Sequence, residues 1–202
     1  CVTFTNKAAR EMRERITRAC GEGMAPSWLG TFHALCARQL RAEPDIAYLR
    51  AGFDIRDADD TLAIVRRLIK ATPVEQLPRP EEGEPGDARQ IAKMVERISR
   101  LKEDLVTPDV AGHHVEAMIA RAHAQNRFVD DAGWRYVVGL YGCYQSLLRE
   151  QNAADFGDLL MWPTLAMLHT DAYRYRWSRR FPAVIADDFQ DVNRAPLLWL
   201  KL

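Results

Sequence analysis

The sequence has no excess charge of either sign and no paired cysteines. Lys and Arg together number 28, and so do Asp and Glu, so the formal net charge is zero. No overall field therefore draws the chain toward a polyanion, and charge has to be judged locally. The cysteines stand far apart without a CxxC pair, at Cys1, Cys20, Cys36 and Cys143. This spacing argues against a zinc site or a disulfide scaffold and fits a reducing cytoplasm.

Long apolar runs are missing as well. Hydrophobic residues make up 48% of the 202 residues, yet no stretch approaches the ~20 apolar residues that a membrane span needs. The opening residues CVTFT begin with Cys rather than Met, and they lack the charged start and long apolar middle of a signal peptide. They are typical of a strand whose upstream context has been cut off. We therefore expect a cytoplasmic globular chain that has no membrane partner.

Both ends of the chain combine short strands with helices. CVTFTNKAAREM begins as a strand and turns helical, with Asn6 as a helix cap and Gly21 as the helix end. WLGTFHALCARQL repeats this arrangement with Thr31 as the cap. Near the C-terminus, an amphipathic helix that begins at Asp171 precedes an apolar strand over 183–186. The strands at the two ends are expected to meet in one sheet.

The middle of the chain is helical. Asp57 can cap a helix, and three more helices follow a loop over 72–88 that is rich in Pro, Gly and acids. Asp155 opens a further helix. The pattern predicts an α/β fold, predominantly helical, in which an all-helical domain is inserted into a partial parallel-sheet domain. The expected boundaries are 1–56 and 153–202 for the split domain and 57–152 for the insertion.

Two basic stretches suggest a nucleic-acid surface. RYRWSRR, residues 174–180, interleaves Arg with aromatic residues. However, Tyr173, Trp177 and Phe181 share one helical face, so an arginine-rich solvated face is the simpler interpretation. A second basic helix face is also expected to be solvated, with a duplex contact as the alternative. It comprises Arg89, Lys93, Arg97, Arg100 and Lys102.

Adjacent carboxylates follow the last strand. In VIADDFQDVN, Asp187 and Asp188 come directly after four apolar residues, and ligands bind beyond the carboxyl ends of strands in open parallel sheets. One carboxylate there can hold Mg²⁺ bound to nucleotide phosphates, while its neighbour orients the attacking water. The alternative is that both acids start a solvated turn or cap the next helix.

TFTN and GTFH stand at the two strand-to-helix turns. Thr5 and Asn6 cap a helix, or they present hydroxyl, amide and N–H groups to a phosphate, with Phe4 available to stack on a base. The second turn can dock a backbone phosphate in the same way, through Gly30, Thr31, Phe32 and His33. No acid or cysteine lies at ligand spacing from His33, so we do not expect a metal there.

Four motifs in this order, VTFTNKAAREM, GTFHALCARQLR, DFGDLL and VIADDFQDVN, resemble the UvrD, Rep and PcrA family of superfamily 1 DNA helicases. The resemblance covers essentially the whole chain. The two ends look like parts of the family's RecA-like motor domain 1A, and the middle looks like its helical insertion 1B. This implies an ATP-dependent helicase that moves on single-stranded DNA and unwinds duplex at a junction, with ATP and Mg²⁺ as cofactors.

The resemblance also implies roles for individual residues. The family's first two motifs contact single-stranded DNA. The resemblance therefore implies that the DNA strand is contacted by Phe4, Thr5, Asn6, Gly30, Thr31, Phe32 and His33. The acidic motif usually reads Asp-Glu-Phe-Gln-Asp in the family. This gives Asp187 the magnesium role, puts Asp188 at the catalytic-base position and makes Gln190 a link between nucleotide and DNA. Asp188 departs from the family pattern, which has Glu.

The resemblance leaves half of an ATP site outside these residues. The family's phosphate-binding GxGKT-type loop is expected upstream of Cys1, and the later motifs, including the arginines of a second motor domain, beyond Leu202. The chain is thus expected to be an internal fragment that is inactive alone. The alternatives are a catalytically impaired DNA-binding or regulatory module, with Asp188 as a sign of decay, and the motor part of a helicase-nuclease.

Overall fold

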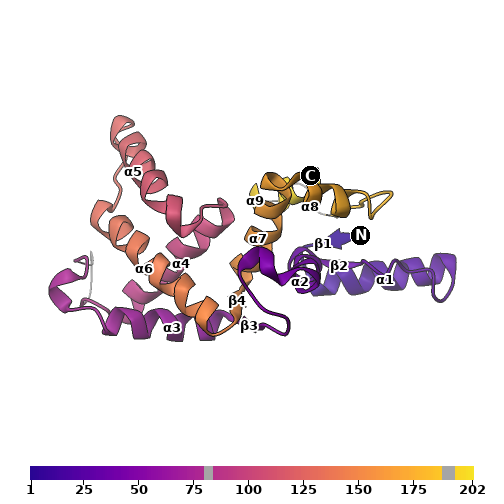
Figure 1. Ribbon diagram of the computed structural model, residues 1–202, viewed down its shortest axis with the longest axis horizontal. Helices are drawn as coiled ribbons and strands as arrows, with labels where there is room; N and C mark the ends of the chain where they lie inside the picture. Colours follow the sequence, from indigo (N-terminus) through magenta and orange to yellow (C-terminus); the bar gives the residue numbers. More distant parts are fainter. Residues whose placement is uncertain (80–83, 188–193) are drawn as a thin grey trace. The chain divides into compact units, whose positions relative to one another are not determined.

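The computed structural model of the chain describes residues 1–79, 84–187 and 194–202 (Figure 1). It is mainly helical and contains two small parallel sheets. The chain divides into two compact units. Unit 1 comprises Cys1–Gly52 and Asp158–Leu202, and unit 2 comprises Phe53–Gly157. Unit 1 is therefore built from two separate stretches of sequence.

Unit 1 is organised around a short parallel sheet. β1 (Val2–Thr3) pairs with β2 (Gly30–Thr31). On its other side, Val2 pairs in parallel with Ala186. The Val2 N–H donates to the Ile185 carbonyl at 2.9 Å, and the Asp187 N–H donates to the Val2 carbonyl at 3.0 Å. The expected pairing of strands from the two ends of the chain is thus confirmed.

Helices follow each strand of unit 1 because a threonine caps them. Thr5 Oγ1 accepts from the Ala8 N–H at 3.1 Å, and Thr31 Oγ1 accepts from the Ala34 N–H at 3.2 Å. The prediction of Thr31 as a cap is confirmed. The prediction of Asn6 as the cap of the first helix is wrong. Thr5, which is extended, caps this helix, and Asn6 is already its first helical residue. The helices of unit 1 are α1 (Asn6–Cys20), α2 (Phe32–Ala42), η1 (Pro44–Ala47), α7 (Phe156–His169), α8 (Asp171–Ser178) and α9 (Arg194–Lys201). The first two residues of α7 belong to unit 2.

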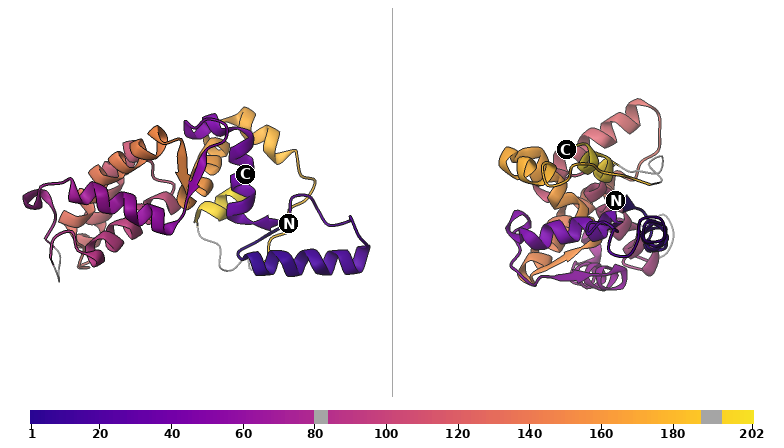
Figure 2. Two further views of the ribbon diagram at one scale, coloured as in Figure 1. Left: turned by 90° about the horizontal axis from the view of Figure 1, so that it is seen from below. Right: turned by 90° about the vertical axis from the view of Figure 1, so that its right-hand side faces the viewer.

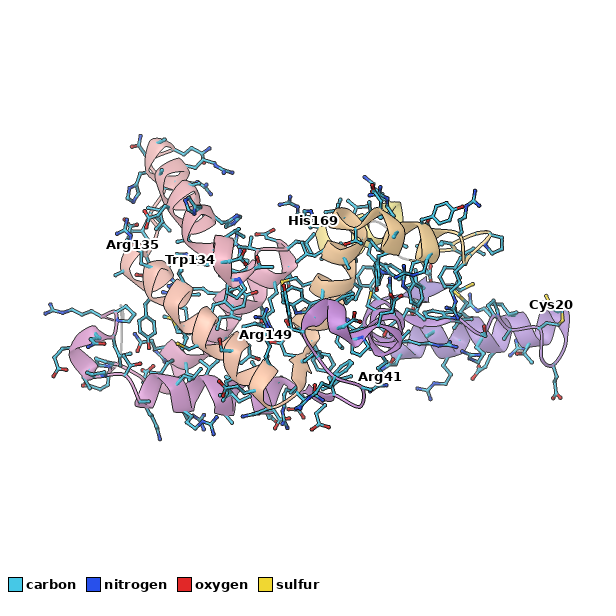
Figure 3. The ribbon with its side chains drawn as sticks, viewed as in Figure 1. Cys20, Arg41, Trp134, Arg135, Arg149 and His169 are labelled. Carbon is cyan, nitrogen blue, oxygen red and sulfur yellow. The ribbon has the colours of Figure 1, made fainter. Side chains whose placement is uncertain are left out.

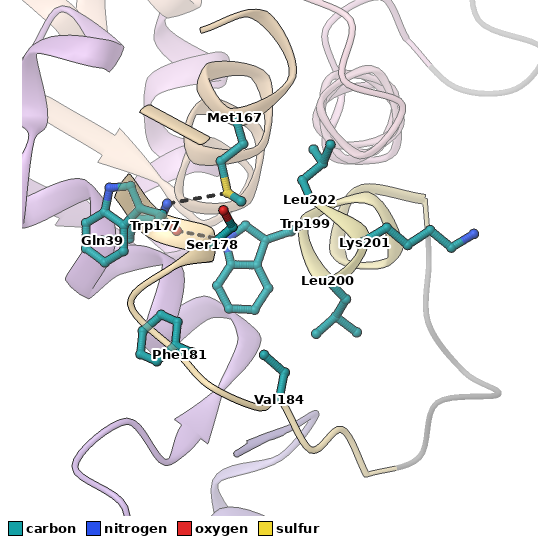
Figure 4. Close-up of a pocket in the computed structure, with 10 residues that line it drawn as sticks. All are labelled: Gln39, Met167, Trp177, Ser178, Phe181, Val184, Trp199, Leu200, Lys201 and Leu202. Atoms are coloured by element: carbon teal, nitrogen blue, oxygen red, sulfur yellow. Dashed lines mark hydrogen bonds between the residues drawn. The ribbon is translucent and has the colours of Figure 1, made fainter. Parts of the chain in front are cut away.

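The helices of unit 1 differ in burial. α2 buries one continuous face that includes Phe32, Leu35 and Leu40, whereas α1 buries no residue and ends at the exposed Cys20 (Figure 3). Gln39 on α2 bridges two other helices: its Nε2 donates to Met167 Sδ at 3.6 Å, and its Oε1 accepts from Trp199 Nε1 at 2.7 Å. These residues line an apolar cavity of about 260 Å³ (Figure 4).

Unit 2 begins and ends on a pair of parallel strands. β3 (Asp54–Arg56) pairs with β4 (Ala153–Asp155), and the two arrows lie side by side in Figure 2. The expectation that a helix opens at Asp155 is confirmed, since this residue ends β4 by pairing with Arg56 and α7 begins at Phe156. The helices between the strands are α3 (Ala58–Lys70), η2 (Val74–Gln76), α4 (Ala88–Glu103), α5 (Pro108–Ala124) and α6 (Asp131–Glu150).

The four long helices of unit 2 share one hydrophobic core. Each contributes fully buried side chains, among them Val65, Met94, Val115 and Tyr141. The stretch predicted as a loop also joins this core through Leu77, and the Pro78 carbonyl accepts from Gln90 Nε2 at 2.7 Å. No helix in the described ranges is long and apolar enough to cross a membrane.

The basic face predicted on α4 is not uniformly solvated. Arg97 is buried, donates to Asp130 Oδ2 at 2.8 Å and lies 4.9 Å from the centre of the Trp134 ring. Lys102 is only 1% exposed, and its Nζ donates to Asp155 Oδ2 at 2.7 Å. The solvated interpretation is therefore wrong for both residues, because each charge has a partner that is distant in the sequence.

Candidate functional site at the carboxyl edge of the sheet

Three segments that carry polar side chains end at one edge of the unit 1 sheet. Thr3 lies opposite Thr31 in the parallel register of β1 and β2, and Val2 pairs in parallel with Ala186. Parallel strands end at the same edge, so the residues that follow them emerge there together. These residues are Phe4, Thr5 and Asn6 after β1, Phe32 and His33 after β2, and Asp187 after the third segment.

Two helix N-termini open at this edge. The first turns of α1 and α2 contain no acidic residue, so the partial positive charge of each N-terminus is not neutralised within its own helix. Thr5 and Asn6 are exposed, while the buried Thr3 donates its hydroxyl to the Thr5 carbonyl at 3.0 Å and fixes the turn. Backbone N–H groups in this arrangement bind phosphate well.

The two phenylalanines of the motifs are placed differently. Phe4 is half-buried, and its ring centre lies 5.1 Å from that of Phe32. Phe32 is only 2% exposed and makes an edge contact with Trp199 at 6.1 Å. Phe4 therefore keeps surface on which a ligand ring can stack, whereas Phe32 supports it from the core.

His33 is exposed at the start of α2, next to Thr31 and Gly30. Desolvation by the surrounding protein lowers the pKa of His33 below its ordinary value. A neutral imidazole can donate one N–H to a phosphate, whereas a protonated imidazole donates two and adds a charge. Within the described ranges, no three His, Cys, Asp or Glu side chains gather as metal ligands.

Asp187 is the acidic member of the site that the structure describes. It is exposed at the end of the third segment, and its backbone N–H is held by the Val2 carbonyl at 3.0 Å. Asp188 and Gln190 lie outside the described residues. The proposed magnesium role of Asp187 thus depends on its position at the carboxyl end of a strand, where a carboxylate can take part in phosphate and metal binding.

Phe156 is a surface aromatic residue that the sequence interpretation did not single out. It is 48% exposed at the junction of β4 and α7, within the motif DFGDLL. Its neighbour Gly157 is tightly packed, since a Cβ there would lie 2.7 Å from Lys102 Cδ. In the sequence, the sign of such an exposed aromatic residue is a Phe that stands between the acids Asp155 and Asp158 at a strand-to-helix turn.

Comparison with known proteins agrees with this arrangement of motifs. The model of the UvrD/REP helicase N-terminal domain matches residues 1–202. The chain is 36% identical over 207 residues to the ATP-dependent DNA helicase UvrD1 of Mycobacterium leprae, covering 99% of this chain and 23% of that protein. It is 31% identical over 201 residues to DNA helicase II of Escherichia coli, covering 100% of this chain and 24% of that protein.

The same coverage holds for a third relative, the ATP-dependent DNA helicase PcrA of Bacillus subtilis. It is 28% identical over 204 residues, which cover 99% of this chain and 24% of that protein. The chain thus spans about a quarter of the length of the curated relatives it matches. Since the family model extends over every residue, the chain belongs to the UvrD/REP helicase N-terminal domain family.

Proposed function

We propose that this chain forms part of the ATP and single-stranded DNA site of a DNA helicase. The observation that carries this proposal is the convergence of Asp187 and two open helix N-termini at one edge of a parallel sheet. A metal-binding acid beside phosphate-binding turns can link a change in nucleotide state to the grip on a DNA strand. Relatives that span the whole chain are ATP-dependent DNA helicases.

The DNA side of the site is formed by the two strand-to-helix turns. The N-terminal N–H groups of α1 and α2, with Thr5, Asn6, Gly30, Thr31 and His33, contact phosphates, and Phe4 stacks on a base. Phe32 acts from beneath by holding the Phe4 ring in place. We propose that unit 2 corresponds to the helical insertion, within the boundaries 57–152, between the two parts of a RecA-like motor domain.

The nucleotide side requires residues beyond this chain. Asp187 would hold Mg²⁺, Asp188 would orient the attacking water, and Gln190 would connect the nucleotide and DNA sides of the site. The phosphate-binding loop and the second motor domain come from other parts of the full-length protein, together with the contacts to the duplex junction. ATP and Mg²⁺ supply the driving chemistry, while these residues position the metal and the water.

Phe4→Ala is expected to weaken single-stranded DNA binding by about 1–3 kcal/mol, since that is the contribution of one base–aromatic stack. Binding by the 202-residue chain should be weak and should weaken further with salt, because few phosphate contacts are available. Fluorescence anisotropy with a labelled oligonucleotide measures both effects.

Phe128→Ala is the matched control for Phe4→Ala. Phe128 in unit 2 is 85% exposed, so its loss removes the same ring without touching the proposed site. Equal affinities of the two variants would show that Phe4 does not stack on DNA. Circular dichroism establishes that the loss of the contact between Phe4 and Phe32 leaves the fold intact.

Asp188→Glu in the full-length protein is expected to raise kcat for ATP hydrolysis at least several-fold. Asp is one methylene shorter than Glu, so its carboxylate reaches roughly 1.5 Å less far, and misplacement by about 1 Å can cost on the order of a hundredfold in rate. Nucleotide affinity should change little, because it depends on Asp187 and the phosphate loop. Single-turnover hydrolysis and ATP titration separate the two quantities.

The shorter acid also favours a second candidate function, a DNA-binding or regulatory module that hydrolyses ATP poorly. If the unaltered protein and Asp188→Glu both hydrolyse ATP at the same, normal single-turnover rate, the shorter acid is tolerated and the second candidate function is excluded. If both versions are inactive although they bind DNA, the module is the better description.

A further inference from the structure

A cluster of arginines and aromatic rings lies at the opposite, amino-terminal edge of the unit 1 sheet. Trp28 lies two residues before the start of β2 at Gly30. The Arg38 guanidinium carbon lies 4.2 Å from the centre of the Trp28 ring, and that of Arg180 lies 5.3 Å from it. α2 and the segment after α8 therefore bring two cations to the same indole.

The two guanidinium groups are held in place by further contacts. Arg38 Nη1 donates to the Ser27 carbonyl at 2.8 Å. Arg180 also lies 5.1 Å from the centre of the Trp177 ring, and Trp177 makes an edge contact with Trp28 at 5.6 Å. A guanidinium fixed in this way still has N–H donors for an anion, and it loses little conformational entropy on binding one.

The charges of this surface do not cancel. The neighbouring acids already have partners, because Glu43 pairs with Arg176 and Asp171 pairs with Arg174. Arg179 lies 4.6 Å from the centre of the Tyr175 ring. Within the described ranges, no carboxylate forms an ion pair with Arg38, Arg179 or Arg180. Three exposed cations thus remain available to an external anion.

We propose that these three arginines bind the phosphate backbone of duplex DNA, at a place distinct from the single-strand contacts at the carboxyl edge. Guanidinium groups already lie over the rings of Trp28 and Tyr175, so those ring faces are taken by cations and are not free for an unstacked base. Such a surface suits a ligand that presents phosphates densely and keeps its bases inside, and duplex DNA carries one charge per about 1.7 Å. This inference rests on the proposed function, in which the parent protein acts on DNA.

The 202-residue chain with Arg38→Gln and Arg180→Gln tests the proposal, with anisotropy of a 20-base-pair duplex and of a single strand measured over a salt series. Loss of two phosphate contacts should weaken duplex binding and reduce the slope of log affinity against log salt by about two, at roughly 0.9 per phosphate. Single-strand binding should change little. Arg66→Gln with Arg67→Gln, two exposed arginines of unit 2, is the control with the same charge change.

The variant Arg38→Lys with Arg180→Lys keeps both positive charges and should retain most of the salt slope. If it does, the weaker binding of the Gln pair reflects lost phosphate contacts and not a loss of folding. The inference is overturned if the Gln pair and the control pair bind duplex equally well. It is also overturned if the Gln pair loses binding to poly-glutamate but not to duplex, since the partner would then be an acidic protein. A failure of the proposed function would appear elsewhere, as single-strand binding that is indifferent to Phe4→Ala.

Discussion

Replacing Lys102 by Met is expected to destabilise unit 2 by about 3–5 kcal/mol, because it leaves a buried carboxylate without its cation. Lys102 Nζ and the Tyr144 hydroxyl both donate to Asp155 Oδ2 at 2.7 Å. Tyr144 is fully buried and Lys102 is 1% exposed, so water cannot replace the lost charge. Urea unfolding of the chain, followed by far-ultraviolet circular dichroism, measures the change, since unit 2 is mostly helical.

Arg135→Met provides the control for Lys102→Met. Arg135 donates to Glu116 at 2.7 Å, but both side chains are more than half exposed, so loss of this pair should have little effect. The double change Lys102→Met with Asp155→Leu should recover much of the stability, because it removes both buried charges. If Lys102→Met is no more harmful than Arg135→Met, the buried pair does not stabilise the fold.

Asp187→Asn in the full-length protein is expected to reduce DNA-stimulated ATP hydrolysis by about a thousandfold or more. A metal ion contributes several kcal/mol to transition-state stabilisation, and each 1.36 kcal/mol is a factor of ten in rate. Asn keeps the size of the side chain, and the backbone bond from residue 187 to the Val2 carbonyl does not involve the carboxylate. The fold should therefore survive. Steady-state kcat over a magnesium titration measures the effect.

Asp45→Asn is the control for Asp187→Asn, since Asp45 is an exposed acid of unit 1 outside the candidate site. Its kcat should equal that of the unaltered protein. The isolated 202-residue chain should show no turnover in the same assay, because phosphoryl transfer also needs the phosphate loop. An unchanged kcat for Asp187→Asn would remove Asp187 from the metal site.

Local signals in the sequence predicted most of the helices. The caps at Asp57 and Thr31 are each contained within one helical turn, and the structure confirms them. β4 was missed because Ala-Ala-Asp has neither alternation nor β-branched residues, and only its pairing with β3 makes it a strand. Tertiary pairing decided that assignment.

The buried cations were predicted wrongly for a related reason. A Lys or Arg on a helix is usually solvated, and the partners of Arg97 and Lys102 are 33 and 53 residues further along the chain. At the candidate site, the rule for strand ends pointed to Asp187, and the capping pattern pointed to Thr5 and Thr31. Neither could show that Phe32 is buried beneath Phe4, because that depends on packing against Trp199.

The pairing of β3 with β4 has a consequence for how such proteins evolve. Unit 2 starts and finishes on adjacent hydrogen-bonded strands, and neighbouring strands lie about 4.8 Å apart. Only a short turn would be needed to join β3 directly to β4, so the helices between these strands can lengthen or shorten without a change in the strand pairing. Related chains are therefore expected to differ in length between β3 and β4 rather than within these two strands.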